Sequence, residues 1–115
     1  MIAGPHQTDR TLIELFANKL STDPAGAAEL FTETAEFKPP GATAHARGRA
    51  QIQQQLAKAP QVAHRVTAHL PRQGDDNFAE ILVEGPGAEQ HIHTVRFRTD
   101  GHSITQLDMV SSRKA

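Results

Sequence analysis

The feature that most constrains the fold is an Asp-Gly pair, Asp100-Gly101, between two segments of alternating apolar and polar residues. A type I′ turn needs positive φ at both central residues, so Asp-Gly between such segments is a strong hairpin signal. The stretch Glu89–Val110 is therefore predicted to form a β-hairpin with a two-residue loop. In that register His93 faces Asp108 across the two strands.

One face of this predicted hairpin is apolar near the turn and polar farther from it. Side chains alternate between the faces of a strand, so eight residues share this face. They are His91, His93, Val95, Phe97, Ile104, Gln106, Asp108 and Val110. Such a change from apolar to polar is typical of a pocket wall. The opposite face carries Ile92, Leu107 and Met109 among polar and charged side chains.

Length and composition exclude several classes of protein. The 115 residues suit one domain with one core. With a net charge of -1 and a pI of about 6.6, the chain lacks the excess positive charge that binding to nucleic acid or an anionic membrane would require. The absence of cysteine excludes a thiol nucleophile and cysteine-ligated zinc. No apolar run reaches the ~20 residues that span a bilayer, and no signal peptide is evident. A cytoplasmic protein is expected.

Three helices are predicted in the first half of the chain. Thr8 or Asp9 can cap the first helix, and its apolar residues recur at helical spacing, as in Ile13, Phe16 and Leu20. Asp23-Pro24 begins the second, with a short stripe that includes Phe31. The third covers roughly Arg49–Ala59 and ends at Pro60.

Alternating or β-branched segments predict the strands. They are Thr34–Lys38, Val62–Pro71, Phe78–Glu84 and the two arms of the hairpin. Residues 1–7 and 111–115 are expected to be frayed ends. The order predicts an α+β domain, with helices on one face of a curved, mainly antiparallel sheet.

The order and spacing of these segments resemble a known family. "AAELFTETAEFKPPG", a loop, "GRAQIQQQL" and four further strands resemble the nuclear-transport-factor-2-like superfamily, and more narrowly its SnoaL-like group of small bacterial proteins. The resemblance runs from about Thr8 to Val110, and its local marks are Leu30-Phe31, Gly48-Arg49 and the polar-lined terminal hairpin. It implies a single domain over 1–115. It also implies a cystatin-like cone of three N-terminal helices on a curved sheet, with an apolar pocket at the open end.

The catalytic residues of the characterised members match this chain poorly. Counting back from Gly48, the base aspartate of ketosteroid isomerase falls on Pro39, and its second aspartate falls on His93. The tyrosine of its oxyanion hole has no counterpart, because the chain has no Tyr. Limonene epoxide hydrolase needs an Asp-Arg-Asp set, of which only Asp108 has a match. The Asp and His of SnoaL-type cyclases resemble Asp108 and His93 in type.

His93 and Asp108 are the predicted catalytic pair. Facing residues have Cβ atoms ~4.5–5.5 Å apart, close enough for a carboxylate–imidazole hydrogen bond. Asp108 would orient His93 as a base, or Asp108 in a drier pocket would be the acid. The alternative is a buried, mutually satisfied pair without chemistry. The resemblance and the strand faces predict eight pocket-lining residues: Phe16, Phe31, Phe37, His64, His91, Val95, Phe97 and Gln106.

The seven histidines also allow a metal interpretation. His91 and His93, with Asp108 and His64, are suitable ligands for zinc or iron. Nothing in the sequence places His64 beside the others, and a His-x-His pair arises easily in a chain this rich in histidine. No metal or cofactor is therefore expected. The other histidines, His6, His45, His69 and His102, are expected in loops or at the surface.

Two classes of function stay open, and whether the protein is an enzyme stays open with them. The first is a cofactor-free lyase, isomerase, cyclase or hydrolase that acts on a small apolar molecule through His93 and Asp108. The second is a non-catalytic ligand-binding or dimerisation module on the same fold. A homodimer through the outer sheet face is expected in either case, because Ile92, Leu107 and Met109 would form an exposed apolar patch there.

Overall fold

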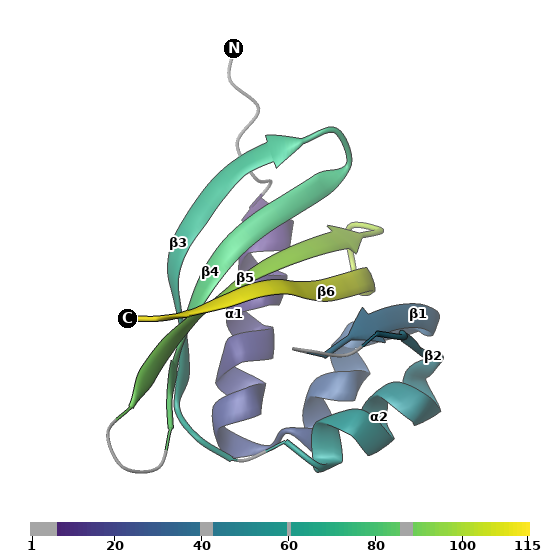
Figure 1. Cartoon of the computed structure of the whole chain (residues 1–115). Coiled ribbons are helices and arrows are strands. Elements are labelled where there is room, and N and C mark those ends of the chain that lie inside the picture. Colours follow the sequence, from purple (N-terminus) through teal and green to yellow (C-terminus); the bar gives the residue numbers. More distant parts are fainter. Residues whose placement is uncertain (1–6, 40–42, 60, 86–88) are drawn as a thin grey trace.

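The computed structural model describes residues 7–39, 43–59, 61–85 and 89–115 (Figure 1). The elements are α1 (Gln7–Thr22), the 3-10 helix η1 (Ala25–Leu30), β1 (Phe31–Lys38), β2 (Ala46–Arg47), α2 (Arg49–Ala57), β3 (His64–Gln73), β4 (Asp76–Glu84), β5 (Gln90–Thr99) and β6 (Ile104–Lys114). The predicted α+β class with a mostly antiparallel sheet is confirmed.

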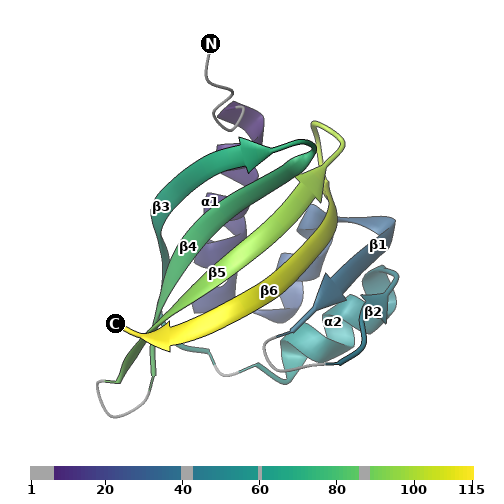
Figure 2. The ribbon, with the colours of Figure 1, turned by 45° about the horizontal axis from the view of Figure 1, so that its top comes forward.

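The six strands form one sheet in the order β2-β1-β6-β5-β4-β3. Strands β3 to β6 are antiparallel neighbours, whereas β1 runs parallel to β6. The long strands bend, and the helices lie on one side of the sheet, with α1 behind β3, β4 and β5 (Figure 2). This helix-covered side is called the inner face below, and the other side the outer face.

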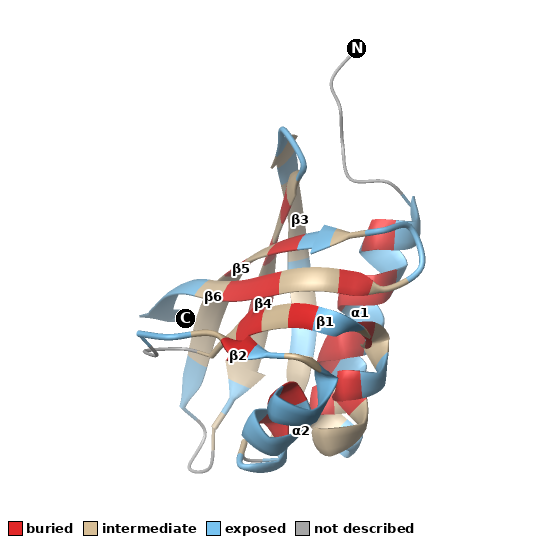
Figure 3. Ribbon diagram, turned by 90° about the vertical axis from the view of Figure 1, so that its right-hand side faces the viewer, coloured by how far each residue is buried: buried red, intermediate tan, exposed pale blue. Residues whose placement is uncertain are grey.

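The core lies between the helices and the inner face (Figure 3). Phe16 of α1 and Phe31 of β1 are fully buried, and Phe37 of β1 is 3% exposed. Their rings meet edge to face, with centroids 5.8, 6.5 and 6.0 Å apart. This is a favourable arrangement for aromatic quadrupoles. The first helix and the first strand are thereby joined through three aromatic rings.

The helix predicted from Asp23-Pro24 is shorter and tighter than an α-helix. Its segment is AGAAEL, and Asp23 Oδ1 accepts a hydrogen bond from Gly26 N at 3.2 Å. Leu30 ends it, and Phe31 is extended at φ −98° and ψ 152°. Phe31 therefore opens β1, and its prediction as part of a helical stripe is wrong. The two-residue strand β2 was not predicted.

The start of α2 is anchored to β1. Gly48 has φ +85°, where an L side chain would be strained, and Gly48 N donates to Ala35 O at 2.8 Å. The Arg49 guanidinium donates from Nε and Nη2 to Phe31 O at 3.1 and 2.9 Å. The Gly48-Arg49 pair thus fixes α2 against the start and the middle of β1.

The predicted register of the terminal hairpin is wrong. The structure pairs His93 with Ser112, and Asp108 with Arg96. Asp100 Oδ1 accepts hydrogen bonds from His102 N at 2.9 Å and Ser103 N at 2.8 Å. The last register pair before the loop is Thr99 with Ile104, so four residues connect the strands rather than two. Register shifts at Arg98/Thr99 and Thr94/Val95 displace β6 further along β5, away from the predicted pairing.

The changed register moves several side chains to the other face of the sheet. Asp108 now points to the outer face with Arg96, while Leu107 is fully buried in the core and Met109 packs against it. Strand β6 continues to Lys114, and Ala115 N donates to Gln90 O at 3.0 Å. The frayed end predicted over 111–115 is therefore wrong.

Candidate functional site

A cavity of about 310 Å³ lies between the end of α1, the end of α2 and the inner face of the sheet. Most of its lining is apolar, contributed by Leu20, Phe37, Pro39, Leu56, Ala59, Val62, Val83 and Met109. Its polar lining residues are Gln55, Lys58, His64 and His93. A largely apolar cavity with a few convergent polar groups is the usual form of a small-molecule site.

His64 is held at the start of β3 by the last turn of α1. Ser21 Oγ accepts from His64 N at 2.8 Å and donates to His64 O at 3.1 Å. The imidazole Nδ1 lies 2.7 Å from Val62 O, and a carbonyl can only accept, so Nδ1 carries the proton. Nε2 is then the basic atom. Burial lowers the pKa of His64, and the hydrogen bond to Val62 opposes this in part.

His93 lies on β5, on the same face as His64 but two strands away. Val83 of β4 pairs with His64 on one side, and Ile81 pairs with His93 on the other. Nδ1 of His93 is buried and has no hydrogen-bond partner in the described part of the chain. Burial lowers the pKa of His93, and the nearby His64 and His91 lower it further.

Both imidazoles can act as general acids or bases near neutral pH. Because both pKa values lie below the ordinary value of about 6.5, both rings are neutral at pH 7. A neutral imidazole carries one donor and one acceptor nitrogen. A buried nitrogen without a partner is costly, and a polar group of a ligand can satisfy it.

The predicted pocket residues fall into four places. Phe37 and His64 line the cavity with His93, whereas Phe16, Phe31, Val95 and Phe97 are buried in the core. His91 is not among the lining residues, and its ring lies 3.8 Å from the Glu89 carboxylate. Gln106 is on the outer face, where its amide lies 3.4 Å from Asp108.

Asp108 is also on the outer face, in a cluster that the sequence did not predict. Asp108 is 2% exposed, and its carboxylate accepts a hydrogen bond from Arg96 Nη2 at 2.8 Å. The other oxygen lies 2.9 Å from Nε2 of His45. Asp108 therefore has a histidine partner, but that partner is His45 rather than His93. His45 lies in the loop before β2, a segment of small residues whose pairing no periodicity in the sequence indicates.

No group of three or more His, Asp or Glu residues that could hold a metal ion occurs among residues 7–39, 43–59, 61–85 and 89–115. Within the same residues, no helix has the length and hydropathy needed to cross a membrane.

Comparisons with known proteins support the fold. No protein-family model matches the sequence, and no curated protein matches it. The structure is similar to a protein with a ketosteroid isomerase-like fold from Catenulispora acidiphila, solved in complex with trimethylamine. The two share 21% identity and a TM-score of 0.71, over 84% of this chain and 82% of that one.

Two other solved structures extend the comparison. The first is an NTF2-like protein from Cytophaga hutchinsonii, at 17% identity and TM-score 0.68, over 96% of this chain and 92% of that one. The second is the epoxide hydrolase/cyclase-like enzyme SalBIII of salinomycin pyran-ring formation, at 16% identity and TM-score 0.68, over 92% and 89%. The chain therefore has the nuclear-transport-factor-2-like fold that its sequence resembles.

Proposed function

We propose that this protein binds a small, mostly apolar molecule with one polar group in the cavity that His64 and His93 line. The observation that carries the proposal is Nδ1 of His93, buried and without a partner in the described part of the chain, at a cavity whose lining is mostly apolar. The apolar walls favour a hydrocarbon body, and the unpaired nitrogen favours a carbonyl or hydroxyl group beside it.

The proposed chemistry is proton transfer at the carbon next to a carbonyl group. Nε2 of His64 takes the α-proton, so the C–H bond breaks, an N–H bond forms, and the electron pair moves onto the carbonyl oxygen. His93 donates a hydrogen bond to that oxygen. In a ketone with a double bond between its β and γ carbons, the electrons of the resulting dienolate reach the γ carbon. Return of the proton to that carbon re-forms the carbonyl group, moves the double bond to the α,β position and completes an isomerisation. Positioned general acids and bases each contribute about 10²–10⁴-fold to such rates.

The similarity to cyclase-like and ketosteroid isomerase-like structures supports a small-molecule site of this kind. In this proposal the helices and the bent sheet form a cone with the cavity at its open end. The protein belongs to the SnoaL-like group of that fold. Asp108 has no part in this chemistry, because it lies on the outer face and is bound to Arg96 and His45.

Exchange of protons in D₂O tests the catalytic step without knowledge of the natural substrate. The α-protons of cyclohexanone and of 2-heptanone are followed by ¹H NMR with and without protein. We expect catalysed loss of the α-proton signal, slowed at least ~10²-fold by His93→Gln and by His64→Gln. His102→Gln, an exposed histidine in the β5–β6 loop, should leave the rate unchanged.

A second function has an observation of its own in its favour. No Asp or Glu lines this cavity among the described residues, so the imidazoles have no carboxylate there to raise their basicity. This favours a binding module without catalysis. Saturable binding of the ketones, with exchange no faster than in buffer, would establish the binding module and overturn the catalytic step.

A further inference from the structure

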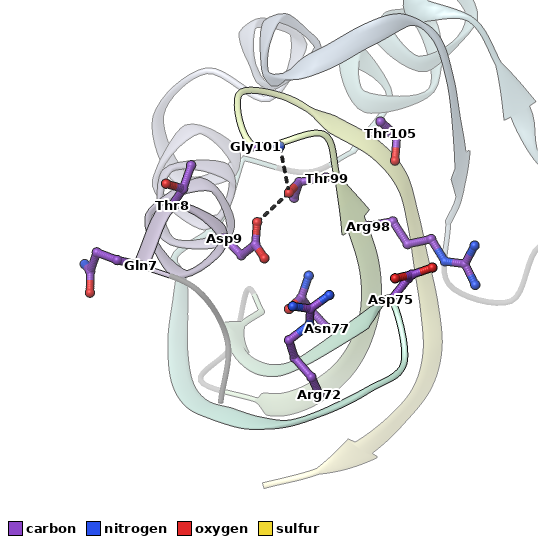
Figure 4. Close-up of a pocket in the computed structure, with 10 residues that line it drawn as sticks. All are labelled: Gln7, Thr8, Asp9, Arg72, Asp75, Asn77, Arg98, Thr99, Gly101 and Thr105. Atoms are coloured by element: carbon purple, nitrogen blue, oxygen red, sulfur yellow. Dashed lines mark hydrogen bonds between the residues drawn. The ribbon is translucent and has the colours of Figure 1, made fainter. Parts of the chain in front are cut away.

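A second, larger pocket lies near the opposite end of α1. It has a volume of about 640 Å³ and is lined by residues from the first turn of α1, from β3 to β6 and from the loops that join these strands (Figure 4). Leu20 lines the first cavity, and Asp9 lines this one. Eleven residues of helix separate the two by roughly 16 Å at 1.5 Å per residue. The two pockets are therefore distinct.

Buried polar groups converge on this second pocket. Asp9 is 4% exposed, and its carboxylate accepts a hydrogen bond from the Thr99 hydroxyl. Asn77 is 1% exposed, and Nδ2 donates to Phe97 O at 3.4 Å. Because that carbonyl can only accept, the amide orientation is fixed and Oδ1 is left as the free atom.

Two buried atoms at this pocket lack partners in the described part of the chain. One is Oδ1 of Asn77, an acceptor, and the other is Nε of Arg72, a donor. Both residues line the pocket, and in Figure 4 their side chains project from the strands toward the side where Asp9 lies. A ligand that offers both an acceptor and a donor can satisfy this unpaired donor and this unpaired acceptor together.

The charges of the lining residues restrict that ligand further. The lining includes two aspartates, Asp9 and Asp75, and two arginines, Arg72 and Arg98, so it presents charges of both signs. Arg98 is already bound to Asp76 at 2.6 Å, which leaves Arg72 as the arginine with an unpaired buried nitrogen. A small molecule that carries both an ammonium and a carboxylate complements this arrangement.

We propose that this pocket binds a small zwitterion of the free α-amino-acid class. The ammonium lies between the Asp9 carboxylate and Oδ1 of Asn77, and the carboxylate pairs with the Arg72 guanidinium. This site is independent of the ketone chemistry proposed for the His64–His93 cavity.

Titration followed by ¹H–¹⁵N NMR tests the proposal with L-alanine as the probe. Ethylamine and propionate are the matched controls, since each keeps one of the two charged groups. We expect saturable shifts with L-alanine in the millimolar range, centred on the amides of Asp9, Asn77 and Gly101. Ethylamine and propionate should each bind at least about tenfold more weakly, because each leaves one charged partner unpaired.

Variants assign the contacts. Arg72→Gln and Asn77→Leu should each weaken L-alanine binding by about tenfold or more, whereas Arg65→Gln, an exposed arginine on the same strand as Arg72, should not change it. The dispersion of the NMR spectrum reports that each variant is folded. The proposal is overturned if L-alanine gives no saturable shift, which would leave the pocket to water. It is also overturned if ethylamine or propionate binds as tightly, or if the Arg72 and Asn77 variants bind normally.

Discussion

At the scale of single residues, the strongest electrostatic feature is the Asp108 carboxylate. It is almost completely shielded from water, yet two oppositely charged or polarised partners, Arg96 and His45, lie within 2.9 Å. Removing one member of a buried ion pair leaves the other charge without compensation, which costs more than the intact pair contributes. Asp108 therefore holds the loop before β2 and strand β5 to the same point on the outer face.

We predict that Asp108→Asn lowers the free energy of unfolding by about 2–3 kcal/mol, measured by urea denaturation. The value lies below that for fully buried pairs because the side chains of Arg96 and His45 are 41% and 29% exposed. The matched control is Asp76→Asn, which breaks the more exposed pair with Arg98 and should cost about 1 kcal/mol or less. Equal losses in the two variants would contradict this account of the cluster.

The two cavity histidines predict a pH dependence of stability. Their folded pKa values lie below the unfolded value of about 6.5, so the folded state resists protonation. The contribution of the two neutral rings to the free energy of unfolding is fully present above the unfolded pKa. This contribution is lost as the pH falls through the folded pKa values. The pKa values of Asp76 and Asp100 are also lowered, but these two carboxylates change the stability only at more acidic pH, in and below the usual aspartate range.

Urea denaturation at pH 7.5 and pH 5.5 measures this effect. We expect lower stability at pH 5.5, and a smaller difference between the two pH values in His93→Gln. His102→Gln, which alters an exposed imidazole, should keep the wild-type difference. A wild-type protein equally stable at both pH values would show that burial does not disfavour the charged rings.

At the scale of elements, the packing of α1 on β1 depends on three phenylalanine rings. Phe31 is fully buried between Phe16 and Phe37, so its truncation creates a cavity that neighbouring elements cannot fill. We predict that Phe31→Ala lowers the free energy of unfolding by about 3–5 kcal/mol in urea denaturation. Leu15→Ala on the exposed side of α1, where Leu15 is 42% exposed, should cost about 1 kcal/mol or less. A loss below 1 kcal/mol for Phe31→Ala would contradict the packing.

The elements also show what the sequence could predict and what it could not. Helical spacing of Ile13, Phe16 and Leu20 correctly predicted α1, and Gly48-Arg49 correctly marked the start of α2. The hairpin failed because Asp100 binds two backbone amides of its own loop. That side-chain interaction replaces a two-residue turn with four residues, and two bulges then shift the register beyond what alternation can reveal.

The error in register had unequal consequences for the site. His93 stayed on the inner face because β5 itself was correctly placed, whereas Asp108 moved to the outer face with β6. His64 reached the cavity through a tertiary contact, its backbone bonds to Ser21 of α1, which no local pattern encodes. Asn77, Arg72 and Asp9 likewise line one pocket only because the tertiary fold brings their strands and helix together.

At the scale of the whole molecule, the outer face remains the surface on which we predict a homodimer. Leu107 and Met109 no longer contribute, since both lie on the inner side. Phe78, Leu82 and Ile92 occupy the outer face instead and are half-buried in the single chain. An apolar patch of this kind on a sheet favours association with a second copy.

Light scattering coupled to size-exclusion chromatography should give a mass twice the 12.5 kDa of one chain at micromolar concentration. Phe78→Arg should shift the protein to the monomer, because it places a charge in the patch. Leu15→Arg, an equivalent change at an exposed leucine of α1, should leave the dimer intact. A wild-type monomer would contradict the prediction.

We propose that the His64–His93 cavity is the functional site of this protein. A crystal structure of the protein saturated with 2-heptanone tests it most directly. We expect the ketone in this cavity, with its hydrocarbon chain against Leu56 and Met109 and its oxygen within hydrogen-bond distance of His93 Nδ1. A cavity without the ketone, or a ketone whose oxygen points away from both imidazoles, would contradict the claim.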